Sequence, residues 1–210
     1  MRLFLASQDF GNHADRLSDM VGKNRKALVI TNARDYRENK GLDAKRKLFK
    51  QNNLDFQELD LREYFGKSDE LRLFIDDYQP GLVVLAGGNM FLLRRALYQS
   101  GFDKILIRDI NDNKYVLAGY SAGSIVVGPD LHGFSQLDDP QLVLPGYQEE
   151  VVWDGLGLTD VLVLPHADSP KYGQKIADAS ALFDRNDWKS VVLNDSDVFV
   201  VDGDKEEALR

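Results

Sequence analysis

Residues 119–123 read Gly-Tyr-Ser-Ala-Gly, which places a serine between two glycines in the pattern G-x-S-x-G. Apolar residues precede it at 115–118 and follow it at 125–127. This order predicts a strand, a sharp turn and a short helix, the arrangement that projects a serine nucleophile from the backbone. The amide of Ala122 would then point at the oxygen that becomes negative during attack. The competing interpretation is that Ser121 is an ordinary turn serine among small residues.

A serine nucleophile needs a base, and the chain has three histidines, His13, His132 and His166. His166 follows an apolar run at 161–165, so it should stand at the carboxyl end of a strand, the edge where open α/β sheets hold their sites. His13 falls early in an expected helix, and His132 falls in the loop after the serine. His166 is therefore the expected base. His132 is the alternative base, and a capping or buried structural role is the alternative for His166.

The base in turn needs a carboxylate that fixes its tautomer and stabilises the imidazolium. Asp138 and Asp139 lie in the loop after the serine, Asp168 lies just past the histidine, and Asp195 lies in a late turn. Residue type and spacing alone do not choose among these four acids.

The developing oxyanion needs a second donor besides the amide of Ala122. Residues 87–89, Gly-Gly-Asn, follow an apolar run at 82–85 and precede an expected helix. Glycines there would let the backbone approach a ligand closely. Because this turn should lie at the same sheet edge as Ser121, the Gly88 amide is the expected partner of the Ala122 amide. A plain strand-to-helix turn is the alternative.

Composition limits the classes of function. The 210 residues carry 34 acids against 26 bases, a net charge of −8, which argues against nucleic-acid and anionic-membrane binding. The sequence contains no cysteine, so disulfides, thiolate metal sites and cysteine nucleophiles are excluded. The apolar start is too short for a signal peptide, and no apolar run is long enough for a membrane helix. We expect a cytoplasmic protein with one domain over residues 1–210.

Apolar runs alternate with helical patterns along the chain, which predicts an α/β fold with a mostly parallel sheet and helices on both faces. Strands are expected at 3–7, 27–30, 56–61, 82–85, 115–118, 158–165, 191–193 and 198–201. Helices are expected at 12–23, 42–51, 68–79, 102–110 and 169–183, and another is expected to contain residues 91–93. Residues 131–147 should form a long loop or hairpin over the site. The charged residues 34–39 should form a surface loop, and the basic residues of 42–51 should form a solvated helix face.

Three motifs together resemble the peptidase E family of serine peptidases, which includes the α-aspartyl dipeptidase and, more distantly, cyanophycinase. They are Ala-Gly-Gly-Asn-Met at 86–90, Gly-Tyr-Ser-Ala-Gly at 119–123, and Asp-Gly-Leu-Gly-Leu at 154–158, which leads to Leu-Pro-His at 164–166. The resemblance runs from the first expected strand to about Val201. It implies a flavodoxin-like or class I glutamine amidotransferase-like fold, with Ser121 as nucleophile and His166 as base. It also implies that the amides of Gly88 and Ala122 form the oxyanion hole.

The resemblance also bears on the acid and on the substrate. The family's acid follows the serine in an Asp-x-Pro-like stretch, so Asp138 is the closest match, Asp139 is next, and Asp195 is a rival that matches a late family glutamate. Asn89 and Tyr172 are expected at the substrate. Tyr172 falls where the dipeptidase has an arginine that grips the substrate's aspartate, and neighbouring lysines offer no bidentate fork in its place.

The sequence therefore predicts a serine peptidase that hydrolyses short peptides, with N-terminal Asp-X as one candidate substrate. The reaction implied by these residues needs no metal or organic cofactor. The expected partner is a small peptide, and the chain should be a monomer or a homodimer.

Two alternatives stay open at this point. An esterase of the α/β-hydrolase kind shares the G-x-S-x-G turn and the order Ser, Asp, His, although its histidine usually lies nearer the C-terminus than His166 does. A binding or regulatory module could also retain the fold without activity.

Overall fold

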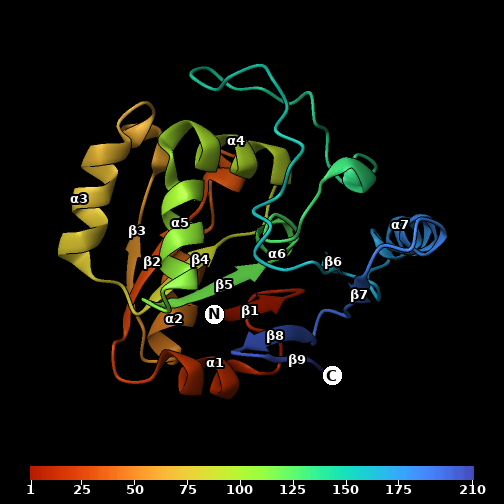
Figure 1. Ribbon diagram of the computed structural model, residues 1–210, viewed down its shortest axis with the longest axis horizontal. Coiled ribbons are helices and arrows are strands. Elements are labelled where there is room, and N and C mark those ends of the chain that lie inside the picture. Colours follow the sequence, from red (N-terminus) through yellow and green to blue (C-terminus); the bar gives the residue numbers. More distant parts are fainter.

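The computed structural model describes residues 1–210, except for the side chain of Leu42. Its centre is a seven-stranded sheet in the order β3-β2-β4-β5-β1-β8-β9 (Figure 1). The first five strands in this order run parallel, and β8 and β9 continue the sheet in antiparallel pairs. A separate parallel pair, β6-β7, lies beside this sheet with α7. The α/β, flavodoxin-like fold expected from the sequence is confirmed.

The elements follow the order expected from the alternation of apolar runs and helical patterns. The strands are β1 (Arg2–Ala6), β2 (Lys26–Ile30), β3 (Asp55–Glu58), β4 (Leu82–Leu85), β5 (Val116–Tyr120), β6 (Leu162–Leu164), β7 (Ser190–Val192), β8 (Val198–Asp202) and β9 (Lys205–Leu209). The α-helices are α1 (Ala14–Val21), α2 (Leu42–Gln51), α3 (Ser68–Tyr78), α4 (Met90–Ser100), α5 (Phe102–Asn111), α6 (Ala122–Ile125) and α7 (Gly173–Arg185). Short 3-10 helices are η1 (Asn32–Arg34), η2 (Leu61–Tyr64) and η3 (His132–Phe134).

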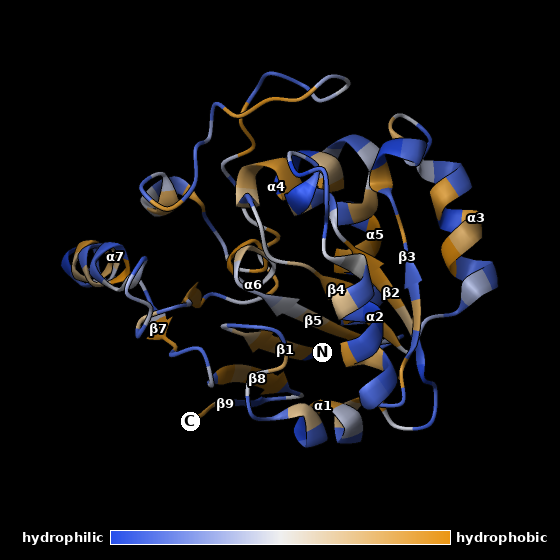
Figure 2. Ribbon diagram, turned by 180° about the vertical axis from the view of Figure 1, so that it is seen from behind, coloured by the Kyte–Doolittle hydropathy of each residue, from blue (hydrophilic) through white to orange (hydrophobic). Residues whose placement is uncertain are grey.

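The central strands are apolar on both sides because helices cover both faces of the sheet (Figure 2). Successive side chains of a strand point to opposite faces. In β1, Leu3 and Leu5 pack with α3, α4, α5 and α6, whereas Phe4 and Ala6 pack with α1 and α2. Each face of the sheet thus has its own apolar core. Because these two cores fix which face each strand residue points to, they also fix the direction of the residues that follow each strand at its carboxyl end.

The carboxyl ends of β1, β4 and β5 lie side by side, since Ala6 pairs with Tyr120 and Leu85 with Gly119. The antiparallel strand β8 begins at this same edge, where Val198 pairs with Ala6. The end of β6 is tied to the same place through the His166 amide, which donates to the Ser7 hydroxyl. This edge therefore gathers residues from widely separated parts of the sequence.

Three details differ from the sequence expectation. The helix expected from Ser169 begins at Gly173, because the amides of Tyr172 and Gly173 both donate to the Ser169 carbonyl and form a turn first. The strand β9 was not expected, since its exposed Lys-Glu-Glu run has no apolar alternation. The strand before His166 belongs to the small β6-β7 pair and not to the main sheet. None of these differences removes His166 from the site.

Among the described residues, no helix is both long enough and apolar enough to cross a membrane.

Candidate active site

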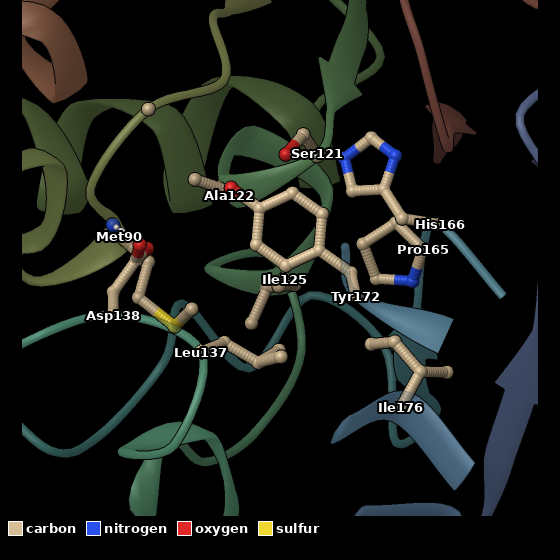
Figure 3. Close-up of a pocket in the computed structure, with 11 residues that line it drawn as sticks. Met90, Ser121, Ala122, Ile125, Leu137, Asp138, Pro165, His166, Tyr172 and Ile176 are labelled. Atoms are coloured by element: carbon tan, nitrogen blue, oxygen red, sulfur yellow. Dashed lines mark hydrogen bonds between the residues drawn. The ribbon is translucent and has the colours of Figure 1, made fainter. Parts of the chain in front are cut away.

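Ser121 sits on a strained turn between β5 and α6. Its backbone φ of 54° and ψ of −122° lie in a region that L-residues rarely adopt. Its amide donates to the carbonyls of Ala6 at 3.2 Å and Ser7 at 2.9 Å, so the end of β1 fixes the turn. The expected order of strand, sharp turn and short helix is observed. The serine hydroxyl consequently faces the cleft at the carboxyl edge (Figure 3).

The two glycines of the pentapeptide are required by close backbone contacts. A Cβ at Gly119 would lie 2.4 Å from the carbonyl oxygen of Gly123, and a Cβ at Gly123 would lie 1.9 Å from that of Leu85 in β4. Both distances are far shorter than a carbon and an oxygen allow. The G-x-S-x-G pattern is thus what allows this turn to pack against its neighbouring strand.

His166 brings its imidazole directly to the serine. Its Nε2 lies 2.8 Å from the Ser121 Oγ, a hydrogen-bonding distance (Figure 3). His166 itself has a positive φ of 66°, and its amide donates to the Ser7 hydroxyl at 2.7 Å. The backbone is therefore held so that the ring projects from the end of β6 toward β5.

The carboxylate that contacts this histidine belongs to Asp195. Its Oδ1 lies 2.5 Å from the His166 Nδ1. Asp195 lies in the turn between β7 and β8, and its amide donates to the Asp168 carboxylate at 2.9 Å. Ser121, His166 and Asp195 therefore form a continuous hydrogen-bonded line.

The expectation that Asp138 is the histidine's partner is wrong in this structure. The Asp138 carboxylate accepts a hydrogen bond from the Met90 amide at 2.9 Å, at the start of α4. Asp139 caps its own turn through the Gln141 amide. The loop that carries both acids passes along the wall of the cleft, while the histidine's Nδ1 faces the turn before β8. Of the acids considered, the rival Asp195 is the one in contact.

Ser7 joins these groups, although it belongs to none of the sequence motifs. It is fully buried immediately after β1. Its hydroxyl accepts from the His166 amide and donates to the Asp195 Oδ1 at 3.2 Å, while its carbonyl accepts from the Ser121 amide. One residue thus contacts all three members of the hydrogen-bonded line. Its position at the end of a buried strand, the same criterion that selected His166, was the available signal.

A pocket opens next to the serine. Its walls are mostly apolar, and Asp138 supplies the carboxylate (Figure 3). The lining residues are Gly88, Met90, Ser121, Ala122, Ile125, Leu137, Asp138, Pro165, His166, Tyr172 and Ile176. The expected loop over the site contributes Leu137 and Asp138. Burial raises the pKa of Asp138, and the Met90 amide and the lysines Lys171 and Lys175 partly offset this effect.

The other expected site residues occupy different positions around this pocket. Gly88 and Ala122 both line it, and a Cβ on Gly88 would lie 2.3 Å from the Ala33 carbonyl oxygen. The Tyr172 ring packs beside the His166 ring, with centroids 5.4 Å apart. Asn89 is buried, where its amide side chain caps α4 and donates to the Asp139 carbonyl. Asn89 therefore supports the wall of the pocket from behind.

The two remaining histidines lie away from the serine. His13 precedes α1, and His132 is exposed, where it contacts the Asp130 carboxylate and stacks on Trp153. Among the described residues, no group of three or more His, Asp or Glu side chains is placed to hold a metal ion.

Two solved structures resemble this fold. A crystal structure of a protein described as a candidate peptidase E from Listeria monocytogenes EGD-e superposes with a TM-score of 0.80 at 20% identity and covers 100% of this chain and 98% of that one. A peptidase from an acI-B1 Actinobacterium gives a TM-score of 0.58 at 17% identity, with coverage of 99% and 93%. At these identities the likeness shows the fold.

Sequence comparison connects the chain with peptidases. It is 30% identical over 97 residues to the uncharacterized peptidase Lin0382 of Listeria innocua, which is 45% of this chain and 44% of the relative. It is 27% identical over 90 residues to the uncharacterized peptidase Lmo0363 of Listeria monocytogenes, which is 43% of this chain and 42% of the relative. Each match thus spans less than half of the relative's length.

The match to a family model covers far more of the chain. The model of peptidase family S51 matches residues 3–209, which include all of the main sheet except its first residue, the serine turn and the histidine. The sequence motifs, the fold and this match agree, and the chain belongs to peptidase family S51.

Proposed function

We propose that the protein is a serine peptidase that hydrolyses short peptides through Ser121, His166 and Asp195. The observation that carries the proposal is the hydrogen-bonded line of these three side chains, with 2.8 Å from Ser121 Oγ to His166 Nε2 and 2.5 Å from His166 Nδ1 to Asp195 Oδ1. A serine, a histidine and a carboxylate in this order are the parts of a nucleophile, a base and an orienting acid.

The proposed reaction proceeds through an acyl-enzyme. Ser121 Oγ attacks the scissile carbonyl carbon while His166 Nε2 accepts its proton. The tetrahedral intermediate collapses as the C–N bond breaks, and His166 gives the proton to the leaving amine. Water, deprotonated by His166, then attacks the ester carbonyl, and the serine leaves with the returned proton. Asp195 keeps Nδ1 protonated and stabilises the imidazolium in both halves.

The amides of Gly88 and Ala122 are proposed as the oxyanion hole. Both residues line the pocket that holds Ser121, and Ala122 directly follows the serine, as the mechanism requires. The close contact of Gly88 with Ala33 leaves no room for a side chain, so only glycine fits at this position of the pocket wall.

The pocket supports a preference for the free N-terminus of a peptide. Its apolar walls suit the side chain of the first residue, and the Asp138 carboxylate suits an α-ammonium group. Lys171 contacts the Tyr172 hydroxyl, and Lys175 donates to the Gln136 carbonyl, so neither supplies the fork that an arginine would offer to an aspartate side chain. We therefore propose a dipeptidase-like enzyme without strict N-terminal aspartate specificity.

Hydrolysis of free dipeptides, measured for the wild type and Ser121→Ala, tests this function. The panel should contain N-terminal Asp, Leu, Met and Phe, each free and N-acetylated. We expect cleavage of the free dipeptides, a loss of about 10⁶-fold in kcat in the variant, and slow turnover of the acetylated forms. Unchanged turnover in Ser121→Ala would contradict the proposed nucleophile. Turnover of acyl esters without peptide cleavage would instead support an esterase.

The raised pKa of Asp138 predicts a gain in stability when its charge is removed. Because burial raises this pKa in the folded state, the protonated form is favoured there, and the benefit is lost as pH rises through the folded pKa. Asp138→Asn keeps an oxygen for the Met90 amide and carries no charge. Its Tm should therefore exceed that of the wild type at pH 7.5, and the difference should shrink as pH falls toward the unfolded value of about 3.9.

Thermal unfolding followed by circular dichroism across this pH range measures the effect. About 1 kcal/mol corresponds to roughly 2–4 °C in a chain of this size. Asp139→Asn, an adjacent exposed carboxylate, is the matched control and should show no comparable gain. A gain for Asp138→Asn that is independent of pH would show that ionisation is not its cause.

A further inference from the structure

A second hollow, of about 250 Å³, adjoins the same serine and differs in character from the apolar pocket. It shares Gly88, Ser121, Asp138, His166 and Tyr172 with that pocket, so the two meet at the proposed nucleophile and the Asp138 carboxylate borders both. Most of its additional walls are polar and come from the loops after β1 and β2 and from α2. They are Gln8, Asp9, Arg34, Tyr36, Arg37 and Lys45, together with Gly87 and Tyr120. Three residues that line the hollow carry a positive charge, and two, Asp9 and Asp138, carry a negative charge.

Lys45 is the most confined of the three cations. It is only 9% exposed, although it belongs to a helix whose other basic residues are solvated. Its ammonium lies 4.5 Å from the centre of the Tyr120 ring, next to the serine turn, and pairs with the Asp9 carboxylate. Burying an ammonium is costly unless it is paired or binds an anion. The Asp9 carboxylate is one anionic partner of this ammonium. The hollow that opens toward Ser121 leaves room for a second anion.

Arg34 is fixed by the backbone that forms the oxyanion loop. Its Nε donates to the Gly87 carbonyl at 2.6 Å, and its Nη1 donates to the Lys40 carbonyl at 3.1 Å. Among the described residues, no acceptor bonds to its Nη2. A guanidinium that neutral carbonyls hold in place retains its full charge and needs little ordering to bind a ligand. Its remaining N–H groups belong to a wall of the hollow.

Arg37 completes the set at the exposed side. Its guanidinium stacks over the Tyr36 ring, 5.1 Å from the ring centre, and its Nε donates to the Tyr36 hydroxyl at 3.0 Å. Described carboxylates make no ion pair with Arg34 or Arg37. The three cations of the hollow therefore outnumber its two carboxylates, and of the three only Lys45 forms an ion pair with a described residue, Asp9.

We infer that Arg34, Arg37 and Lys45 form a subsite that binds a carboxylate of the substrate beside Ser121. The inference rests on the proposed function in one respect, namely that the ligand is a peptide. A peptide offers such a group in two places, an acidic side chain or the free C-terminal carboxylate. In a zwitterionic dipeptide, Asp138 would receive the ammonium group while these cations receive the carboxylate, so the two charges fix the direction in which the substrate lies.

Binding to the Ser121→Ala protein tests the subsite without cleavage. Calorimetric titration measures the affinity for two pairs of peptides. Leu-Leu compared with Leu-Leu amide gives the contribution of the C-terminal carboxylate, and Asp-Leu compared with Asn-Leu gives the contribution of the side-chain carboxylate. For at least one pair, we expect loss of the carboxylate to weaken binding by about tenfold, the equivalent of 1.4 kcal/mol. The pair that responds identifies the source of the carboxylate.

The same titrations on Ser121→Ala/Lys45→Met and Ser121→Ala/Lys47→Met assign the effect to the subsite. Lys47 is an exposed lysine on the same helix, so its substitution removes the same charge from the molecule. The carboxylate preference should fall to about twofold or less with Lys45→Met and persist with Lys47→Met. Ser121→Ala/Arg37→Gln, which alters an exposed side chain, should reduce the preference too and serves if Lys45→Met fails to fold.

Two results would overturn the subsite: equal binding of both members of each pair, or an equal loss of preference in the Lys45 and Lys47 variants. Both are independent of the proposed chemistry. A wild type that cleaves no peptide would contradict the proposed function, whereas a carboxylate preference that depends on Lys45 and Arg37 would still support the subsite.

Discussion

Replacing Asp195 with asparagine is expected to lower kcat by about 10³–10⁴-fold, while the fold and Tm stay close to those of the wild type. The carboxylate accepts a hydrogen bond from the Nδ1–H of His166, which keeps that proton on Nδ1 and leaves the Nε2 lone pair free to accept the proton of Ser121. An amide can donate to Nδ1 instead and so favours the wrong tautomer. It also removes the negative charge that stabilises the imidazolium.

Asp138→Asn is the matched control, since it makes the same chemical change in a second acid at the cleft. Its carboxylate contacts the Met90 amide and not the histidine, so kcat should stay within about tenfold of the wild type. KM for free dipeptides should rise, because the proposed contact with the α-ammonium group is weakened. Steady-state kinetics of the two variants on one dipeptide decide the matter. A large fall in kcat for Asp138→Asn with a small one for Asp195→Asn would reverse the assignment.

The second large effect concerns the fold of the serine turn. Gly123→Ala would place a methyl group 1.9 Å from the carbonyl oxygen of Leu85, which is backbone of the central strand β4. Neither the strand nor the turn can move away without breaking the ladder between β4 and β5. The substitution should lower the free energy of unfolding by more than about 4 kcal/mol, which is a large effect for a single substitution. Denaturant unfolding, or the soluble yield if the variant does not fold, measures this cost.

Gly128→Ala provides a graded control a few residues away. Its added methyl group would meet the Val161 carbonyl oxygen at 3.1 Å, a contact that a shift of a few tenths of an ångström relieves. This variant should fold and retain activity. Equal stability of the Gly123 and Gly128 variants would show that the turn is more tolerant than its packing implies.

The sequence predicted the sheet and two members of the hydrogen-bonded line because these depend on strong local signals. Apolar runs in β1, β2, β4 and β5 are long enough to be read as buried strands, and both Ser121 and His166 directly follow such runs. The carboxyl-edge rule places Ser121 at the edge of the main sheet. His166 follows a strand of the separate β6-β7 pair and reaches the same edge through the hydrogen bond from its amide to the Ser7 hydroxyl. Ser7 follows the same rule and could have been included on that basis.

The acid could not be chosen in the same way. Asp195 precedes an antiparallel strand, and its place at the carboxyl edge depends on β8 pairing with β1 in reverse. Within the sequence it is one acid in an Asn-Asp-Ser-Asp turn, which resembles any solvated turn. Asp138 matched the position of the family's acid, yet its loop follows the pocket wall.

The second hollow, with Arg34, Arg37 and Lys45, could not be predicted from local sequence patterns either. The pattern of α2 predicts a solvated basic face, and most of its charged residues are exposed. Lys45 departs from its neighbours because the Tyr120 ring and Asp9 cover it, and both come from other parts of the chain. A surface loop was likewise expected at 34–39, but the carbonyls of Gly87 and Lys40 turn Arg34 toward the cleft.

Labelling of the wild type with a small serine-directed phosphonate, followed by mass spectrometry, tests the central claim most directly. We expect one adduct per chain, located on the peptide that contains Ser121, with slow labelling in Asp195→Asn and none in Ser121→Ala. An adduct on another residue, or equal labelling of Ser121→Ala, would contradict Ser121 as the nucleophile. A wild type that stays unlabelled under conditions that label a known serine peptidase would contradict the account as well.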